Sequence, residues 1–319
     1  MSQGNLIDVS PDVTIFRSEV IQGLRKPQKE IPCKYLYDER GAQLFEQICE
    51  LPEYYPTRIE LAIMERTIDQ MAARLGARCL LIEYGSGAGI KTRVLLDALE
   101  RPVAYVPIDI ACDQLAEAAG RLQERYPALE VRPICADYTD DFELPKLWTS
   151  AARRAVFFPG STIGNFHPAD AEQFMRHVRK IIGGSGALLL GVDLKKDSAV
   201  LERAYNDAAG VTAAFNLNLL TRLNRELGGD VLLDRFRHRA VYDAQRGRIE
   251  MHLVSVRPQS FQVAGQEFTL SEGEAIHTEY SYKYSLAEFR DLAARSRFEV
   301  RQVWTDPDEL FSVQFLEAA

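Results

Sequence analysis

Three glycines at alternate positions follow a short apolar segment and form the part of the chain best suited to chemistry. Residues 79–84 include the acid Glu83; Gly85, Gly87 and Gly89 come next, and residues with helical spacing follow them. This order indicates a strand, a tight loop and a helix, because glycine lets a backbone turn sharply and lets a ligand lie directly against it. The loop is either purely structural or, as we expect, the binding site of a nucleoside-type cofactor at Gly85 and Gly87.

The type of cofactor is indicated by the residues around the loop. Asp109 ends the next apolar segment and could bind the hydroxyls of a ribose. The pattern is G-x-G-x-G, with Ile90 at the last glycine position of the dinucleotide fingerprint. Glu83 would repel a phosphate and suits a cationic ligand that carries an amino acid. We therefore expect S-adenosylmethionine. Lys91 could bind the carboxylate of this ligand, or it could be an ordinary surface lysine.

Two later strand ends carry further candidates. Asp137 and Tyr138 follow the third predicted strand, where Asp137 could accept the adenine amine and Tyr138 could cover the ring. Asn165 lies in the glycine-containing segment 157–166, and its neutral amide both donates and accepts hydrogen bonds. Asn165 is either a turn residue with left-handed geometry or part of a loop that approaches the reacting centre.

The elements that must position these residues alternate along the chain. The predicted strands are 79–83, 103–109, 129–134, 155–158 and 186–193, and the predicted helices are 92–100, 113–125 and 168–182. Such alternation predicts a parallel sheet with crossover helices. Residues 298–305 and 310–316 then predict an antiparallel hairpin, which follows a helix that opens at a capping box, Ser285 to Glu288. A mostly parallel sheet with a terminal antiparallel hairpin is typical of the Rossmann-like α/β fold of class I methyltransferases.

The pattern changes inside this predicted core. Residues 198–227 have helical spacing, residues 234–256 predict a hairpin, and residues 260–284 predict further short strands. We therefore expect a cofactor-binding core and a smaller α+β substrate-binding domain. The core is expected to comprise residues 60–196 and 285–319, and the smaller domain residues 1–59 and 197–284.

Composition excludes several classes of function. With 38 basic and 46 acidic residues the net charge is −8, so the usual electrostatic attraction to nucleic acid is missing. No apolar run approaches the roughly 20 residues of a membrane helix, and the N-terminus lacks the features of a secretory signal. Five scattered cysteines suit reduced thiols in a cytoplasm, and five scattered histidines suggest no metal site. We expect a cytoplasmic monomer that acts on a small molecule.

Several blocks together resemble the histidine-specific Nα-methyltransferases of ergothioneine biosynthesis. The resemblance spans nearly the whole chain, and its most specific parts are L-P-E-Y-Y-P-T-R at 51–58 and G-S-T-I-G-N-F at 160–166. The other matching blocks are Y-D-x-x-G at 37–41 with L-F-E at 44–46, E-x-G-S-G at 83–87 with K-T at 91–92, A-Y-N-D at 204–207, T-A-A-F-N at 212–216 and T-E-Y-S-x-K-Y at 278–284.

The resemblance implies a role for each matching residue. The residues that would hold S-adenosylmethionine are Gly85, Lys91, Asp109, Asp137 and Tyr138, with Lys91 on its carboxylate and Asp109 on the ribose diol. For the substrate, the implied residues are Tyr54, Asn165 and Tyr205 at the amino-acid head, Glu279 and Ser281 at the imidazole, Met251 along the ring pocket, and Tyr37 near the α-amine. We therefore expect Tyr37 and Asn165 at the reacting centre and L-histidine, converted to Nα,Nα,Nα-trimethylhistidine, as the substrate.

Three alternatives remain at this point. Relatives of this family methylate other amino acids or aromatic amines, such as tryptophan derivatives. A nicotinamide-dependent oxidoreductase is disfavoured by the incomplete G-x-G-x-x-G pattern and by the antiparallel ending. A binding protein that kept the fold but lost catalysis is disfavoured, because Tyr54, Asp109, Asn165 and Glu279 are all present. One departure from the family pattern is Tyr84, which replaces a frequent Leu and points either to the ligand or to the core.

Overall fold

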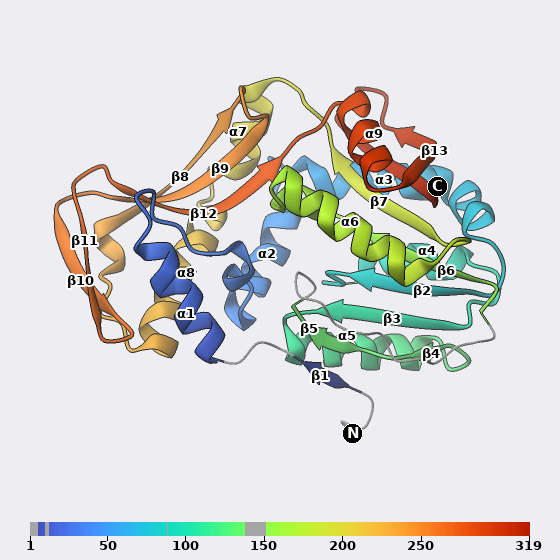
Figure 1. Cartoon of the computed structure of the whole chain (residues 1–319), viewed down its shortest axis with the longest axis horizontal. Helices are drawn as coiled ribbons and strands as arrows, with labels where there is room; N and C mark the ends of the chain where they lie inside the picture. Colours follow the sequence, from blue (N-terminus) through green and yellow to red (C-terminus); the bar gives the residue numbers. More distant parts are fainter. Residues whose placement is uncertain (1–5, 10–12, 88, 138–150) are drawn as a thin grey trace. The chain divides into compact units, whose positions relative to one another are not determined.

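The computed structural model describes residues 6–9, 13–87, 89–137 and 151–319, and the chain forms two compact units (Figure 1). Unit 1 comprises residues 1–10, 56–195 and 282–319, and unit 2 comprises residues 11–55 and 196–281. Among the described residues, no helix is both long enough and apolar enough to cross a bilayer.

Unit 1 contains one large sheet. Its strands are β1 (Ile7–Val9), β2 (Cys79–Tyr84), β3 (Ala104–Asp109), β4 (Glu130–Val131), β5 (Ile134–Ala136), β6 (Arg153–Phe158), β7 (Ala187–Asp193), β13 (Phe298–Thr305) and β14 (Phe311–Ala318). The order across the sheet is β1-β5-β3-β2-β6-β7-β14-β13, with β4 beside β3. The strands from β1 to β7 pair in parallel, whereas β14 is antiparallel to both β7 and β13. This arrangement confirms the predicted class I α/β sheet with its terminal hairpin.

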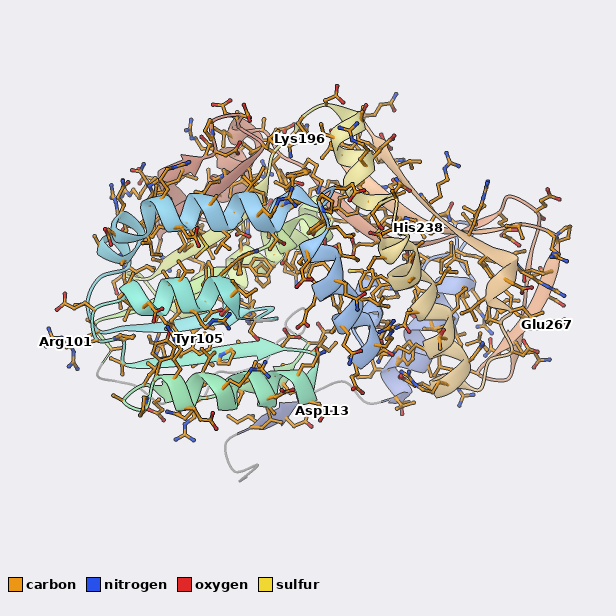
Figure 2. The ribbon with its side chains drawn as sticks, turned by 180° about the vertical axis from the view of Figure 1, so that it is seen from behind. Arg101, Tyr105, Asp113, Lys196, His238 and Glu267 are labelled. Carbon is orange, nitrogen blue, oxygen red and sulfur yellow. A yellow bond between two sulfur atoms is a disulfide. The ribbon has the colours of Figure 1, made fainter. Side chains whose placement is uncertain are left out.

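Helices cover both faces of this sheet (Figures 1 and 2). They are α3 (Tyr55–Leu75), α4 (Ile90–Ala98), α5 (Cys112–Arg125), α6 (Pro168–Ile182) and α9 (Leu286–Arg295), with a 3-10 helix η2 (Thr162–Asn165). The helices α3, α4 and α5 form one apolar core with alternate side chains of the sheet, among them Tyr105 and Phe157. The helix α6 covers the opposite face, where Phe174 packs against Tyr84 and Phe158. Both faces of the strands are therefore buried, which explains their continuous apolar sequences.

Two details of the sheet differ from the prediction. The third strand is interrupted, because Pro133 has no N–H for the ladder and separates β4 from β5. Residues 7–9, which we expected in the smaller domain, form β1 and pair with Ile134, Cys135 and Ala136 of β5. This short segment therefore belongs to the sheet of unit 1, and assigning it to the smaller domain was wrong.

Unit 2 combines helices with two small sheets. Its helices are α1 (Val13–Leu24), η1 (Cys33–Leu36), α2 (Glu39–Glu50), α7 (Ser198–Tyr205), α8 (Val211–Leu227) and η3 (Leu233–Arg235). Its strands are β8 (Phe236–Asp243), β9 (Arg248–Ser255), β10 (Gln259–Val263), β11 (Gln266–Leu270) and β12 (Ala275–Tyr282). The strand orders are β12-β9-β8 and β10-β11. The predicted helices, hairpin and short strands after residue 197 are confirmed.

Candidate active site

The glycine loop after β2 exposes its backbone. Gly85, Gly87 and Gly89 have φ values of +70°, +45° and +68°, a region that favours glycine. A Cβ atom added at any of these three positions would meet no heavy atom within 4 Å. The loop is therefore an open backbone cradle against which a ligand can lie, as the sequence predicts.

Asp109 ends β3, the neighbour of β2, and its carboxylate is fixed beside this loop. Its Oδ2 accepts the Gly87 N–H at 3.3 Å, and its Oδ1 accepts the Ala111 N–H at 3.1 Å. Burial raises the pKa of Asp109, and the backbone N–H donors partly oppose that rise. The structure thus brings Asp109 and Gly87 together at the carboxyl ends of neighbouring parallel strands.

The polar groups of this region fit S-adenosylmethionine. Ser86 Oγ is buried and has no hydrogen-bond partner among the described residues, so it is available to a ligand. Asp137, directly after β5, is 4% exposed. Tyr138, which was predicted to cover the adenine, lies outside the described residues. The open glycine cradle, the fixed Asp109 carboxylate and the Ser86 hydroxyl offer the backbone contact and the polar groups that suit an adenosine.

Lys91 has a partner that the sequence did not indicate. The ammonium of Lys91, in the first turn of α4, forms an ion pair with Glu60 of α3. The Glu60 carboxylate is completely buried and also accepts the Gly160 N–H. Lys91 is therefore held in place rather than being a mobile surface lysine.

Glu83 does not act as the sequence argument supposed. Its Oε2 accepts hydrogen bonds from Thr92 Oγ1 at 2.7 Å and from Tyr105 OH at 2.6 Å, inside the core. Burial raises the pKa of Glu83 to about 8, although Tyr105, Thr92 and Lys91 oppose the rise. Glu83 thus fastens α4 to β2 from inside the core, where its raised pKa disfavours the charge that the sequence argument assigned to it.

The substitution Glu83→Gln should flatten the pH dependence of stability. A carboxyl whose pKa rises from 4.5 to about 8 on folding binds its proton more tightly in the folded state. Its stabilising contribution is therefore complete below about pH 4.5 and is lost as the pH rises to about 8. The free energy of unfolding should fall by up to about 1.4 kcal/mol per pH unit in this window, and Glu83→Gln should remove that part of the slope. Urea unfolding of both proteins across this pH range measures it, and equal slopes would contradict the prediction.

Tyr84 points to the core. It is fully buried, and its ring packs edge-on against Phe158 at 6.2 Å and Phe174 at 5.4 Å between ring centroids. Burial raises the pKa of its phenol. The departure from the family pattern therefore concerns the packing of this face of the sheet under α6.

Asn165 is the last residue of η2, in the loop that follows β6. Ser161, at the start of this loop, has a positive φ of +57°, and its Oγ accepts the Asp193 N–H at 2.9 Å. The Asp193 carboxylate in turn forms a fully buried ion pair with Lys283, with 2.7 Å between Oδ2 and Nζ. The loop that carries Asn165 is thus fixed to the carboxyl end of β7.

Gly164 lets this loop lie directly against the backbone of Tyr282. A Cβ atom at Gly164 would lie 2.6 Å from the Tyr282 carbonyl oxygen and 3.2 Å from its nitrogen. Gly164→Ala should therefore destabilise the protein by about 1–3 kcal/mol, because backbone atoms cannot rotate away from an added methyl group. Gly184→Ala is the matched control, since a Cβ there meets nothing within 4 Å. Similar urea midpoints for the two variants would show that η2 is not packed as described.

The other predicted substrate residues lie in unit 2, where aromatic rings gather around Tyr54. The Tyr54 ring is 6.2 Å from that of Phe45 and 6.1 Å from that of Tyr205, in edge-on geometry. Tyr37 packs edge-on against Phe45 and Phe215, at 5.5 Å from each. The structure therefore brings Tyr37, Tyr54 and Tyr205 into one aromatic cluster.

Tyr54, at the centre of this cluster, keeps its proton. Burial raises the pKa of Tyr54 well above its usual range, and Tyr205, Cys49, Tyr37 and Glu279 add to the rise. Tyr54 therefore stays a neutral phenol that can donate a hydrogen bond.

Glu279 and Ser281 lie two residues apart on β12 and so face the same side of the strand. Tyr205 OH donates to Ser281 Oγ at 2.9 Å, which joins α7 to β12. Met251 on the neighbouring β9 is 1% exposed, and its carbonyl oxygen accepts a hydrogen bond from Thr278 Oγ1. Of the predicted substrate residues, only Asn165 belongs to unit 1.

His238 is a polar residue near this cluster that the sequence analysis did not single out. Its Nε2–H donates to the Tyr205 carbonyl at 2.8 Å, so its Nδ1 accepts from Asn216 Nδ2 at 2.9 Å. These two partners assign the neutral Nε2–H tautomer, and burial lowers the pKa of the ring. His238 thereby fixes the backbone at Tyr205. Its partner Asn216 lies in the family block at 212–216. His238 itself lies outside every family block, so nothing in the sequence pointed to it.

Two of the cysteines are not free thiols. Cys112, at the start of α5, and Cys135, in β5, form a disulfide, of which Cys33, Cys49 and Cys79 are not part. The expectation of reduced thiols was therefore wrong for this pair. The two residues are 23 positions apart, and only the pairing of β5 beside β3 brings them together.

The family follows from a comparison of the whole chain with known proteins. A family model described as histidine-specific methyltransferase, SAM-dependent, matches residues 16–318. This chain belongs to the histidine-specific methyltransferase family. The matched range includes residues of both units.

Individual relatives of the chain agree with the family match. The chain is 38% identical over 313 residues to the histidine N-alpha-methyltransferase of Mycolicibacterium smegmatis, and the alignment covers 96% of each chain. It is 39% identical over 298 residues to the protein of the same name from Mycobacterium tuberculosis, which covers 91% of each. Ergothioneine biosynthesis protein 1 of Neurospora crassa is 30% identical over an alignment of 323 residues, gaps included, that covers 97% of this chain and 36% of the fungal protein.

Membership in the histidine-specific methyltransferase family decides two of the open questions. The enzyme is an S-adenosylmethionine-dependent N-methyltransferase, and S-adenosylmethionine is its cofactor. The nicotinamide-dependent and the non-catalytic alternatives are therefore excluded. The expected enzyme class and the expected cofactor are confirmed.

Proposed function

We propose that the enzyme transfers three methyl groups in succession to the α-amine of L-histidine and forms Nα,Nα,Nα-trimethylhistidine (hercynine). The observation that carries the proposal is the group formed by Glu279, Ser281 and the tyrosines of unit 2. Glu279 and Ser281 supply acceptors on one face of β12 for the imidazole N–H groups, and Tyr54 and Tyr205 lie beside them. The names of the two mycobacterial relatives support histidine as the acceptor.

Hydrogen-bonding groups of this kind favour histidine over most amino acids. A buried site built to bind a polar group can reject an analogue without that group by up to roughly 10⁴-fold, because its own polar atoms would lose their partner. Met251 is assigned to the wall of the ring pocket. Unit 2, together with the last residue of β12, is accordingly proposed as the substrate-binding domain. Unit 1 is proposed as the cofactor-binding domain.

S-adenosylmethionine supplies a methyl group that is activated by its positively charged sulfur. The residues assigned to hold it are Gly85, Gly87, Lys91, Asp109, Asp137 and Tyr138. Among these, the open glycine cradle and the fixed Asp109 carboxylate have the chemistry that an adenosine requires. Lys91 is assigned to the carboxylate of the amino-acid tail.

The protein groups assigned to the acceptor have to orient an amine and let it lose protons. Methyl transfer needs a neutral, aligned nitrogen, so positioning accounts for much of the catalysis. Tyr54, Tyr205 and Asn165 are assigned to the amino-acid head, and Tyr37 is assigned to the region of the α-amine, where a tyrosine or a water accepts the proton. As methylation proceeds the nitrogen becomes a quaternary cation, which the faces of tyrosine rings stabilise.

Mass spectrometry of the product tests the proposal. Incubation with L-histidine and S-adenosylmethionine should give one final product that has gained three methyl groups. Accumulation of a singly methylated product would contradict the trimethylation. L-tryptophan is the competing acceptor, and faster turnover of tryptophan than of histidine would overturn the substrate assignment while leaving the enzyme class intact.

A further inference from the structure

Glu60 is a fully buried carboxylate that contacts two segments of the cofactor-binding unit. It lies in the second turn of α3 with no exposed surface. Its Oε2 pairs with the Lys91 ammonium, and the Gly160 N–H lies 2.8 Å from Oε2 and 3.1 Å from Oε1. One side chain therefore connects α3 to the first turn of α4 and to the loop after β6.

The surrounding backbone is shaped to admit this carboxylate. A Cβ atom at Gly191 of β7 would lie 2.0 Å from Glu60 Oε1, so only glycine fits there. Gly160 has a positive φ of +78°, and a Cβ atom there would lie 3.8 Å from Lys91 Nζ. The absence of a side chain at Gly191 thus leaves the space that the Glu60 carboxylate occupies.

A requirement for folding alone does not explain a carboxylate at this position. Burying a charged group costs free energy that its partners must offset, and apolar residues of similar volume stabilise a core equally well or better. The apolar neighbours Ile63 and Met64 on the same helix show that α3 packs on the sheet through ordinary hydrophobic side chains. The charge of Glu60 therefore points to a task carried out through Lys91.

We propose that Glu60 is a positioning residue for the cofactor: it holds the Lys91 ammonium where that group meets the carboxylate of S-adenosylmethionine. An ammonium has three N–H donors, so contact with Glu60 leaves donors for a second carboxylate. A lysine side chain that is already ordered loses less conformational entropy when it binds a ligand. The inference rests on the assignment of Lys91 in the proposed function.

The test compares two ligands that differ in the amino-acid tail, whose carboxylate is the group that Lys91 would contact. S-adenosylhomocysteine carries the amino-acid tail, whereas 5′-methylthioadenosine has the same adenosine and thioether but no carboxylate. Glu60→Gln keeps the side-chain size and an oxygen that can accept from Gly160. Its affinity for S-adenosylhomocysteine in titration calorimetry should fall about tenfold, and its affinity for 5′-methylthioadenosine should stay within twofold of the wild type.

Matched variants separate this inference from general damage and from the assignment of Lys91. Glu65→Gln makes the same chemical change at an exposed position of α3 and should bind both ligands like the wild type. Lys91→Met should weaken S-adenosylhomocysteine at least as much as Glu60→Gln does and should spare 5′-methylthioadenosine. The double variant should be no weaker than Lys91→Met alone, because both changes act on one contact.

Each contrary result overturns a defined statement. Equal losses for both ligands in Glu60→Gln would reduce Glu60 to a structural role. Unchanged or tighter binding of S-adenosylhomocysteine in Glu60→Gln, with a loss in Lys91→Met, would overturn this inference alone. An unaffected Lys91→Met would overturn the assignment of Lys91 and this inference with it. If Glu60→Gln does not fold, Glu60→Asp, which is one methylene shorter, should show the same selective loss.

Discussion

The variant Asp109→Ala should bind S-adenosylhomocysteine about 100-fold more weakly than the wild type. The Asp109 carboxylate is held by the Gly87 and Ala111 N–H groups and is assigned to the two hydroxyls of the ribose. Hydrogen bonds to a charged group contribute about 1.5–3 kcal/mol each, and every 1.4 kcal/mol changes affinity tenfold. Loss of about 3 kcal/mol therefore corresponds to the expected factor, which titration calorimetry measures.

The control for this change is Asp113→Ala, an exposed acid in the first turn of α5. It alters the net charge by the same amount in the same region and should leave the affinity unchanged. Asp109→Asn keeps the shape of the side chain and should lie between the two. If Asp109→Ala binds as tightly as the wild type, the ribose lies elsewhere and the assignment of the loop must be revised.

The variant Glu279→Ala should raise the KM for histidine about 100-fold while the affinity for S-adenosylhomocysteine stays unchanged. Glu279 is 7% exposed and close enough to Tyr54 to raise the pKa of its phenol. A charged acceptor for an imidazole N–H in such a site contributes about 1.5–3 kcal/mol, and its removal leaves the ligand's donor unpaired. Steady-state kinetics and calorimetry on the same preparation separate the two quantities.

Glu272→Ala is the matched control, because Glu272 is an exposed acid just before the same strand. It should behave like the wild type in both measurements. If Glu279→Ala loses cofactor affinity while Asp109→Ala loses histidine affinity, the two binding sites have been interchanged. A loss of both in Glu279→Ala, with a lower melting temperature, would indicate damage to the fold of unit 2.

The sheet of unit 1 could be predicted because its strands are buried on both faces and are separated by clear helix signals. Pro168 at the start of α6 and the capping box of Ser285 and Glu288 mark helix ends that the structure confirms. The strand β1 could not be predicted, because three residues at 7–9 form a strand only where β5 offers an edge. The interruption at Pro133 was visible in the sequence and was overlooked.

The candidate site was predictable in its residues but not in its contacts. Asp109 and Gly87 were found because Asp109 ends one apolar strand and Gly87 follows another, and these two strands lie side by side. Glu60 was missed, because one acid within a helical pattern looks like part of the exposed face until Lys91 and Gly160 are seen beside it. The orientation of Tyr84 and Glu83 was undecidable from an apolar run, since both faces of β2 are buried and alternation carries no signal.

The position of β14 has a consequence for how this protein is made. The strand β14 follows β13 in the chain but lies inside the sheet, between β7 and β13. Until Phe311–Ala318 is synthesised, β7 presents an unpaired edge of apolar residues that can pair with a strand of another nascent chain. A chain interrupted before β14 would lack the strand that lies between β7 and β13, so the sheet cannot be completed until this segment is present.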